Sequence, residues 1–120
     1  MPSRRSPDPF AVQLGERIRQ IRKEKKMSLN ELARAAGISR GHLSDIEQGK
    51  VVMMIGTLGS LARALETPPF VIGLVPADDP DVVVVDRVLA AADYDLKKAA
   101  EIMRAAIFGA EAPKEPDPDE

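Results

Sequence analysis

The chain has 120 residues, which is enough for one domain with a modest core and too few for two complete domains. It has no cysteine, which excludes disulfides, thiolate zinc sites and a cysteine nucleophile. Aromatic residues make up only 3% of the chain, which favours packed helices over a sandwich or barrel. Residues 1–50 carry 11 basic and 6 acidic side chains, whereas residues 51–120 carry 6 and 13. This asymmetry fits a surface for a polyanion and equally fits ordinary solvated faces.

The first nine residues contain three prolines and no apolar periodicity, which predicts a flexible N-terminal arm over residues 1–9. Asp8 and Pro9 then form a helix start, with an N-cap aspartate and a proline at the first helical position. Apolar residues follow at helical spacing: Phe10, Leu14, Ile18 and Ile21. We therefore predict a first helix over about residues 9–25.

Two short helices are expected next. Ser28 and Glu31 have the spacing of a capping box, which predicts the start of the second helix. Gly37 suits a left-handed turn that ends this helix, and Ser39 can cap the third helix, which we expect to end near residues 48–49. Ala33 is expected to be small because the third helix crosses close to it. The apolar positions that fix the third helix against its neighbours are expected at Leu43 and Ile46.

A fourth helix is predicted over residues 55–65 and a short fifth helix from Pro68-Pro69 to about Leu74. The expected buried positions of the fourth helix are Ile55, Leu58, Leu61, Ala62 and Leu65. Residues 10–75 are thus interpreted as one domain of five helices.

The remaining segment begins with a polar connector over residues 76–80. One helical face is expected to contain Val82, Val85, Leu89 and Ala92, although residues 82–85 alone also fit a strand. Asp93 or Asp95 can cap a last helix that Gly109 ends. An apolar stripe repeats along that helix at Leu96, Ala100, Met103 and Ile107. We predict a C-terminal helical segment over residues 80–109 and a disordered acidic tail over residues 110–120.

The run from Leu14 to Lys50, LGERIRQIRKEKKMSLNELARAAGISRGHLSDIEQGK, closely resembles the lambda-repressor and Cro-like helix-turn-helix family, also called XRE. The later LARAL segment is similar to the fourth helix of that family. The resemblance implies an all-α fold, with a five-helix Cro/repressor-like domain followed by a short helical C-terminal extension. It also implies that the third helix enters the major groove of DNA as the recognition helix.

The resemblance implies roles for individual residues. The solvent-facing candidates for base contacts are Ser39, Arg40, Gly41, Ser44 and Asp45. Arg40 is the leading one, since its guanidinium can pair with guanine O6 and N7; a phosphate contact is the alternative. The candidates for contacts to the DNA backbone are Ser28, Asn30, His42 and Lys50. Arg22 and Glu47 match a family pair that braces the domain internally.

Two positions depart from the family pattern. Leu29 occupies a place where the family often has glutamine, which removes one polar contact near the DNA backbone. Val51, Val52, Met53 and Met54 replace residues that are usually polar or proline. We expect either that two of these four side chains tuck under the fourth helix, or that the segment is a surface for a protein partner.

A single recognition helix reads few base pairs, so specificity normally requires a dimer that binds two half-sites. The stripe from Leu96 to Ile107 is the predicted dimer seam, helped by Val82, Val85 and Leu89. The alternative is that these helices fold back on the first domain.

The sequence therefore predicts a dimeric transcriptional regulator, most simply a repressor, that binds double-stranded DNA. An autoregulating antitoxin of a toxin–antitoxin pair and a protein–protein adaptor with weakened DNA affinity are the alternatives. No catalytic frame, phosphate loop or metal cluster is recognisable, so we expect no enzyme activity, no cofactor and no metal. Without a signal segment or an apolar run near 18 residues, the expected location is the cytoplasm, in association with the nucleoid.

Overall fold

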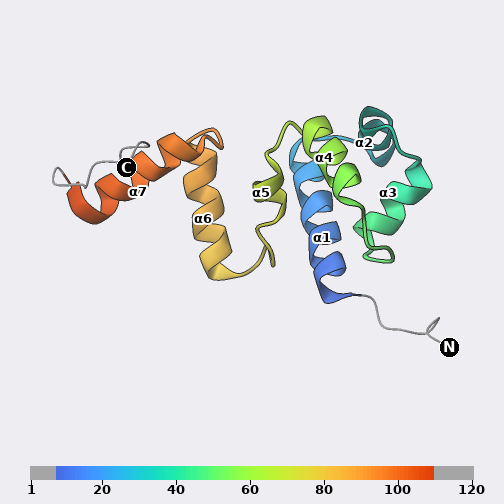
Figure 1. The fold of residues 1–120 in the computed structure, drawn as a ribbon, viewed down its shortest axis with the longest axis horizontal. Helices are drawn as coiled ribbons and strands as arrows, with labels where there is room; N and C mark the ends of the chain where they lie inside the picture. The colour runs from blue at the N-terminus through green and yellow to red at the C-terminus, as the bar shows by residue number, and fades with distance from the viewer. Residues whose placement is uncertain (1–7, 110–120) are drawn as a thin grey trace, which may run out of the picture. The chain divides into compact units, whose positions relative to one another are not determined.

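The computed structural model describes residues 8–109, and every regular element in this range is a helix (Figure 1). The expected all-α class is therefore confirmed. The chain divides at Val83–Val84 into two compact units, which we call the N-terminal unit and the C-terminal unit. The predicted tail over residues 110–120 lies outside the described residues. The predicted arm does too, except for Asp8 and Pro9, which belong to the first helix start.

Helix α1 spans Pro9–Glu24 and starts as the sequence predicts. One carboxylate oxygen of Asp8, Oδ1, accepts hydrogen bonds from the backbone N–H groups of Phe10 at 2.8 Å and Ala11 at 3.0 Å. Ile18 and Ile21 are buried as expected. Phe10 is 56% exposed although it shares their face, because it lies in the first turn of α1, where that face is not covered.

Helices α2 (Leu29–Ala36) and α3 (Arg40–Glu47) follow with the predicted caps. The capping box is complete: the Glu31 N–H donates to Ser28 Oγ at 3.0 Å, and the Ser28 N–H donates to Glu31 Oε1 at 3.1 Å. Gly37 ends α2 with φ of 73°, a left-handed conformation that glycine adopts without a Cβ penalty. Ser39 Oγ then accepts the backbone N–H of His42 at 3.0 Å and starts α3.

Helices α4 (Ile55–Ala64) and α5 (Pro69–Ile72) complete the N-terminal unit. Leu61, Ala62 and Leu65 are buried as predicted, whereas Leu58 is only half-buried and packs against the edge of the core. The prediction for Ile55 is wrong, since it is 88% exposed. Its direction matches the apolar face of α4, but it is the first residue of the helix and no neighbouring element covers it.

A single apolar core joins α1 to α5 and holds α3 in place. Helix α1 packs against α3 and α5, and α2 packs against α3 and α4. The core consists of Ile18, Ile21, Leu32, Ala33, Leu43, Ile46, Leu61, Ala62, Leu65 and Ile72. Burial of this many aliphatic side chains is the main stabilising contribution in a small helical domain.

The C-terminal unit contains most of α6 (Pro80–Ala91) and all of α7 (Leu96–Phe108). Residues 82–85 are helical, so the strand alternative is excluded. Asp95, rather than Asp93, caps α7, because its carboxylate accepts the Lys98 N–H at 3.0 Å. Gly109 is the C-cap of α7. None of the helices within residues 8–109 combines the length and apolarity needed to cross a membrane.

Candidate nucleic-acid interface

Helix α3 presents two different faces. Leu43 and Ile46 are buried and hold the helix against the core. Arg40, Gly41 and His42, in its first turn, are exposed. Among residues 8–109, the Arg40 side chain has no hydrogen-bond or ion-pair partner, so its guanidinium can bind a ligand without breaking an internal contact. The fold therefore leaves the N-terminal end of α3 open to solvent.

The five candidates for base contacts all lie on α3 or on its cap. Ser39 is exposed, and its hydroxyl oxygen accepts the helix-capping bond while its O–H hydrogen stays available as a donor. Ser44 and Asp45 are half-buried, one turn further along. Ser44 Oγ accepts a hydrogen bond from Gln48 Nε2 at 2.7 Å, which fixes its orientation. These residues form a short row of polar groups beside Arg40 and Gly41.

The four candidates for DNA-backbone contacts are all exposed. Ser28 and Asn30 lie at the N-terminal end of α2, where free N–H groups and the helix dipole favour an anion. Hydrogen bonds from the Ser28 N–H and hydroxyl lower the pKa of the Glu31 carboxyl, so this group is ionised at neutral pH. His42 lies on α3, and Lys50 is the third residue after this helix ends.

Leu29, the first residue of α2, is half-buried and packs against the core. Its side chain thus contributes apolar packing beneath α2.

An ion pair joins α1 to the end of α3. Arg22 Nε donates to Glu47 Oε2 at 2.8 Å, and Arg22 Nη2 donates to Glu47 Oε1 at 2.9 Å. The two side chains are only 12% and 6% exposed. Arg22 Nη1 also donates to the Met27 carbonyl at 3.0 Å, at the turn before α2. The hydrogen bond and charge of Glu47 raise the pKa of Arg22 further above its ordinary value. The pair thus links α1 to the end of α3 and is largely shielded from solvent.

Sequence reasoning missed the close approach of α1 to the end of α3. A Cβ atom on Gly15 would collide with the Ile46 carbonyl oxygen and lie 2.8 Å from that of Glu47. Gly49, with φ of 71°, approaches α1 in the same way: its Cβ would lie 2.6 Å from Val12 Cγ2. A glycine in the middle of an otherwise good helix is the signal that indicates such an approach.

Arg17 was also missed as a buried residue. It is 2% exposed, and its Nε donates to the Val71 carbonyl at 3.1 Å, which ties α1 to α5.

Of the four apolar residues 51–54, two pack inward and two are exposed, so the segment fits both the packing expectation and the partner-surface expectation. Val51 and Met53 are half-buried and pack against the core, whereas Val52 and Met54 are 77% and 78% exposed. Within residues 8–109, no three His, Cys, Asp or Glu side chains are grouped so that they could hold a metal ion.

A family model and several known proteins match the N-terminal part of this chain. A family described as a helix-turn-helix domain matches residues 13–70. The immunity repressor protein of Bacillus phage phi105 is 42% identical over 52 residues, which cover 43% of this chain and 36% of the repressor. The transcriptional regulator SinR of Bacillus subtilis is 54% identical over 35 residues, 29% of this chain and 32% of SinR. In both cases the chain spans less than half of the relative's length.

Two solved structures are similar over more of their length. The restriction-modification controller protein C.AhdI from Aeromonas hydrophila is 30% identical with a TM-score of 0.50, covering 50% of this chain and 91% of that protein. The clp gene regulator ClgR from Corynebacterium glutamicum is 27% identical with a TM-score of 0.51, covering 91% of this chain and all of that one.

Proposed function

Because the chain belongs to the lambda-repressor and Cro-like family of helix-turn-helix proteins, we propose that it binds double-stranded DNA sequence-specifically and represses transcription. The observation that carries the proposal is the exposed N-terminal turn of α3, which is held from behind by the core and by the Arg22–Glu47 pair. A rigid helix with an exposed polar end is what readout of the major groove requires. Such a role needs access to the chromosome, so we propose a cytoplasmic, nucleoid-associated location and a function in binding without catalysis.

In this proposal α3 lies in the major groove. The base contacts come from Ser39, Arg40, Gly41, Ser44 and Asp45. Arg40 pairs with a guanine, and Asp45 accepts from a cytosine amino group or orients Arg40. The exposed groups Ser28, Asn30, His42 and Lys50 contact phosphates on either side of the groove.

We propose a homodimer, because two recognition helices are needed to read two half-sites. The proposed seam is the α7 stripe Leu96, Ala100, Met103 and Ile107. Leu96 and Ile107 are 61% and 71% exposed, and Ala100 and Met103 are half-buried. Large exposed apolar side chains on one helix face favour a protein contact there.

A second candidate is a protein–protein adaptor with weakened DNA affinity. The exposure of Val52 and Met54 and the inward packing of Leu29 favour it.

Selection of bound sequences from a random DNA pool, read at two salt concentrations, distinguishes the two candidates. A repressor enriches a palindromic motif, whereas an adaptor leaves the pool without an enriched motif.

Arg40→Ala then tests the recognition helix itself. We expect specific affinity to fall by about 1–3 kcal/mol while affinity for unrelated DNA stays nearly unchanged. Arg87→Ala, which removes an exposed arginine of α6, is the matched control and should leave both affinities unaltered. An equal loss on all sequences would make Arg40 a phosphate contact.

A further inference from the structure

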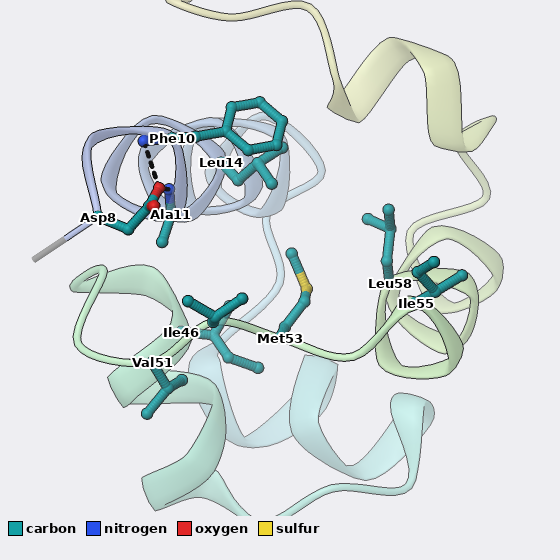
Figure 2. A pocket seen from close by; sticks show the side chains of 10 residues that line it. Asp8, Phe10, Ala11, Leu14, Ile46, Val51, Met53, Ile55 and Leu58 are labelled. Atoms are coloured by element: carbon teal, nitrogen blue, oxygen red, sulfur yellow. Dashed lines mark hydrogen bonds between the residues drawn. The ribbon is translucent and has the colours of Figure 1, made fainter.

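An apolar pocket of about 240 Å³ opens on the N-terminal unit, between the start of α1, the segment after α3 and the start of α4 (Figure 2). None of the proposed DNA-contacting residues lines it. Its lining residues are Asp8, Phe10, Ala11, Leu14, Ile46, Val51, Val52, Met53, Ile55 and Leu58. The pocket is therefore separate from the proposed DNA surface, although Ile46 belongs to α3.

The pocket has a packed floor and an exposed rim. Figure 2 shows Phe10 and Leu14 on the α1 side, Ile55 and Leu58 on the α4 side, and Met53 rising between them. Leu14, Met53 and Leu58 are half-buried and pack against the core, while Phe10 is 56% and Ile55 is 88% exposed. A pocket of about 240 Å³ is large enough for several non-hydrogen atoms of a small ligand. Its aliphatic lining suits the apolar part of a small ligand, such as a short aliphatic chain.

Asp8 is the one ionisable group among the described residues that line the pocket. Its Oδ1 atom already accepts the N–H groups of Phe10 and Ala11, so the carboxylate is held at the rim by the start of α1. Its Oδ2 atom has no hydrogen-bond partner within residues 8–109. An apolar cavity with a fixed carboxylate at its mouth is complementary to an apolar group that carries a positive charge.

We propose that this pocket binds a small amphiphilic cation, with its aliphatic chain against Leu14, Met53 and Leu58 and its ammonium group against Asp8. A fatty acid of the same length would bring a second carboxylate beside that of Asp8, and it would be repelled because the Asp8 charge exceeds the partial positive charge of the α1 N-terminus. A neutral chain would fill the cavity but leave the Asp8 carboxylate without a counter-charge. The proposal concerns binding to the protein alone and does not rest on the DNA-binding function.

The probe is n-octylammonium, titrated into the full chain while the methyl resonances of Met53, Leu14 and Leu58 are followed by NMR. We expect saturable shifts confined to the pocket, with affinity about threefold higher than for octan-1-ol, since an ion pair that is exposed to solvent adds little affinity. Octanoate should bind more weakly than the alcohol.

Two variants separate the roles of charge and cavity. Asp8→Asn keeps an N-cap residue for α1 but removes the charge, so octylammonium should bind as weakly as octan-1-ol while the alcohol is unaffected. Ala11→Leu fills the cavity from a helical position and should abolish binding of both probes. If Ala11→Leu does not fold, the proposal is still tested by Asp8→Asn: it fails if octylammonium binds this variant as tightly as it binds the unaltered chain.

Three outcomes would overturn the proposal. The first is the absence of saturable shifts at the pocket residues. The second is equal affinity for octylammonium and octanoate in the unaltered chain. The third is a change of the same resonances with protein concentration when no probe is present, because a second copy of the chain would then occupy the pocket.

Discussion

The two units of the molecule differ in how they use apolar side chains. In the N-terminal unit, aliphatic residues from α1 to α5 converge on one core, and ten of them are buried. In the C-terminal unit, the buried apolar residues are Leu89, Ala92 and Ala99 among those described, and two of the three are alanine. The same unit exposes Val84, Val85, Leu96, Ile102, Ile107 and Phe108.

This difference indicates a division of labour. The N-terminal unit buries enough aliphatic side chains in one core to have the properties of a self-sufficient fold, although Val52, Met54 and Ile55 stay exposed. The C-terminal unit buries too little to be stabilised mainly by its own packing, and its large side chains are available to a partner. Substitutions in the N-terminal unit should therefore change the stability of the fold, whereas substitutions on the exposed face of α7 should change association.

Replacing Arg22 with Leu should destabilise the N-terminal unit by about 3 kcal/mol. The substitution leaves the Glu47 carboxylate, 6% exposed, without its counter-charge and leaves the Met27 carbonyl without a donor. Urea unfolding followed by circular dichroism measures the loss. The double variant Arg22→Leu with Glu47→Leu should recover part of it, because no unpaired charge remains. A loss below about 1 kcal/mol would show that the pair is not a brace.

Replacing Ile107 with Glu should dissociate the proposed dimer without unfolding the N-terminal unit. Sedimentation equilibrium should give a monomer, and affinity for an operator with two half-sites should fall about 100-fold, since the linked second half-site is lost. Ala105→Glu is the control, because residue 105 is exposed on the opposite face of α7. If Ala105→Glu dissociates the protein equally, the seam is not the Leu96–Ile107 stripe.

Replacing Gly15 with Ala should cost about 2 kcal/mol, because the added methyl group meets the Ile46 and Glu47 carbonyls at the end of α3. Gly56→Ala is the matched control: it is also helical but has open space around it, and should stabilise the fold by about 0.5 kcal/mol. Thermal unfolding of both variants measures the difference. Equal behaviour of the two would mean that α1 and α3 can separate without cost.

The smallest effect is expected from the α2 capping box. The pKa of Glu31 is lower in the folded chain than its ordinary value of 4.5, so the folded state binds fewer protons. The stabilisation from this group is present above that value and is lost as the pH falls through the lower, folded-state pKa. Glu31→Gln keeps the acceptor and should flatten this acid-side part of the pH–stability profile. An unchanged profile would contradict the contribution of Glu31.

The local features of the fold could be predicted from the sequence. The caps Asp8, Ser28, Ser39 and Asp95 and the turn at Gly37 depend on residues within four positions of each other, so short patterns suffice. The exposure of Phe10 and Ile55 could not be predicted, because periodicity gives the direction of a side chain and not the presence of a neighbour.

Features that depend on distant contacts were also beyond the sequence patterns. Gly15 meets α3 and Arg17 meets Val71, 54 residues away, so nothing near either residue indicates its partner. The exposed face of α3 was predictable from its apolar positions, whereas the empty pocket beside Asp8 results from the packing of three separate segments.

The glycine contact and the Arg22–Glu47 pair together have a kinetic and thermodynamic consequence. They fix the orientation of α3 from its C-terminal end before any ligand arrives, so complex formation does not have to order this helix. The free energy of its contacts is then available for affinity and for discrimination between sequences. Association should proceed as the docking of a preorganised surface, and sequence preference should appear chiefly in the dissociation rate.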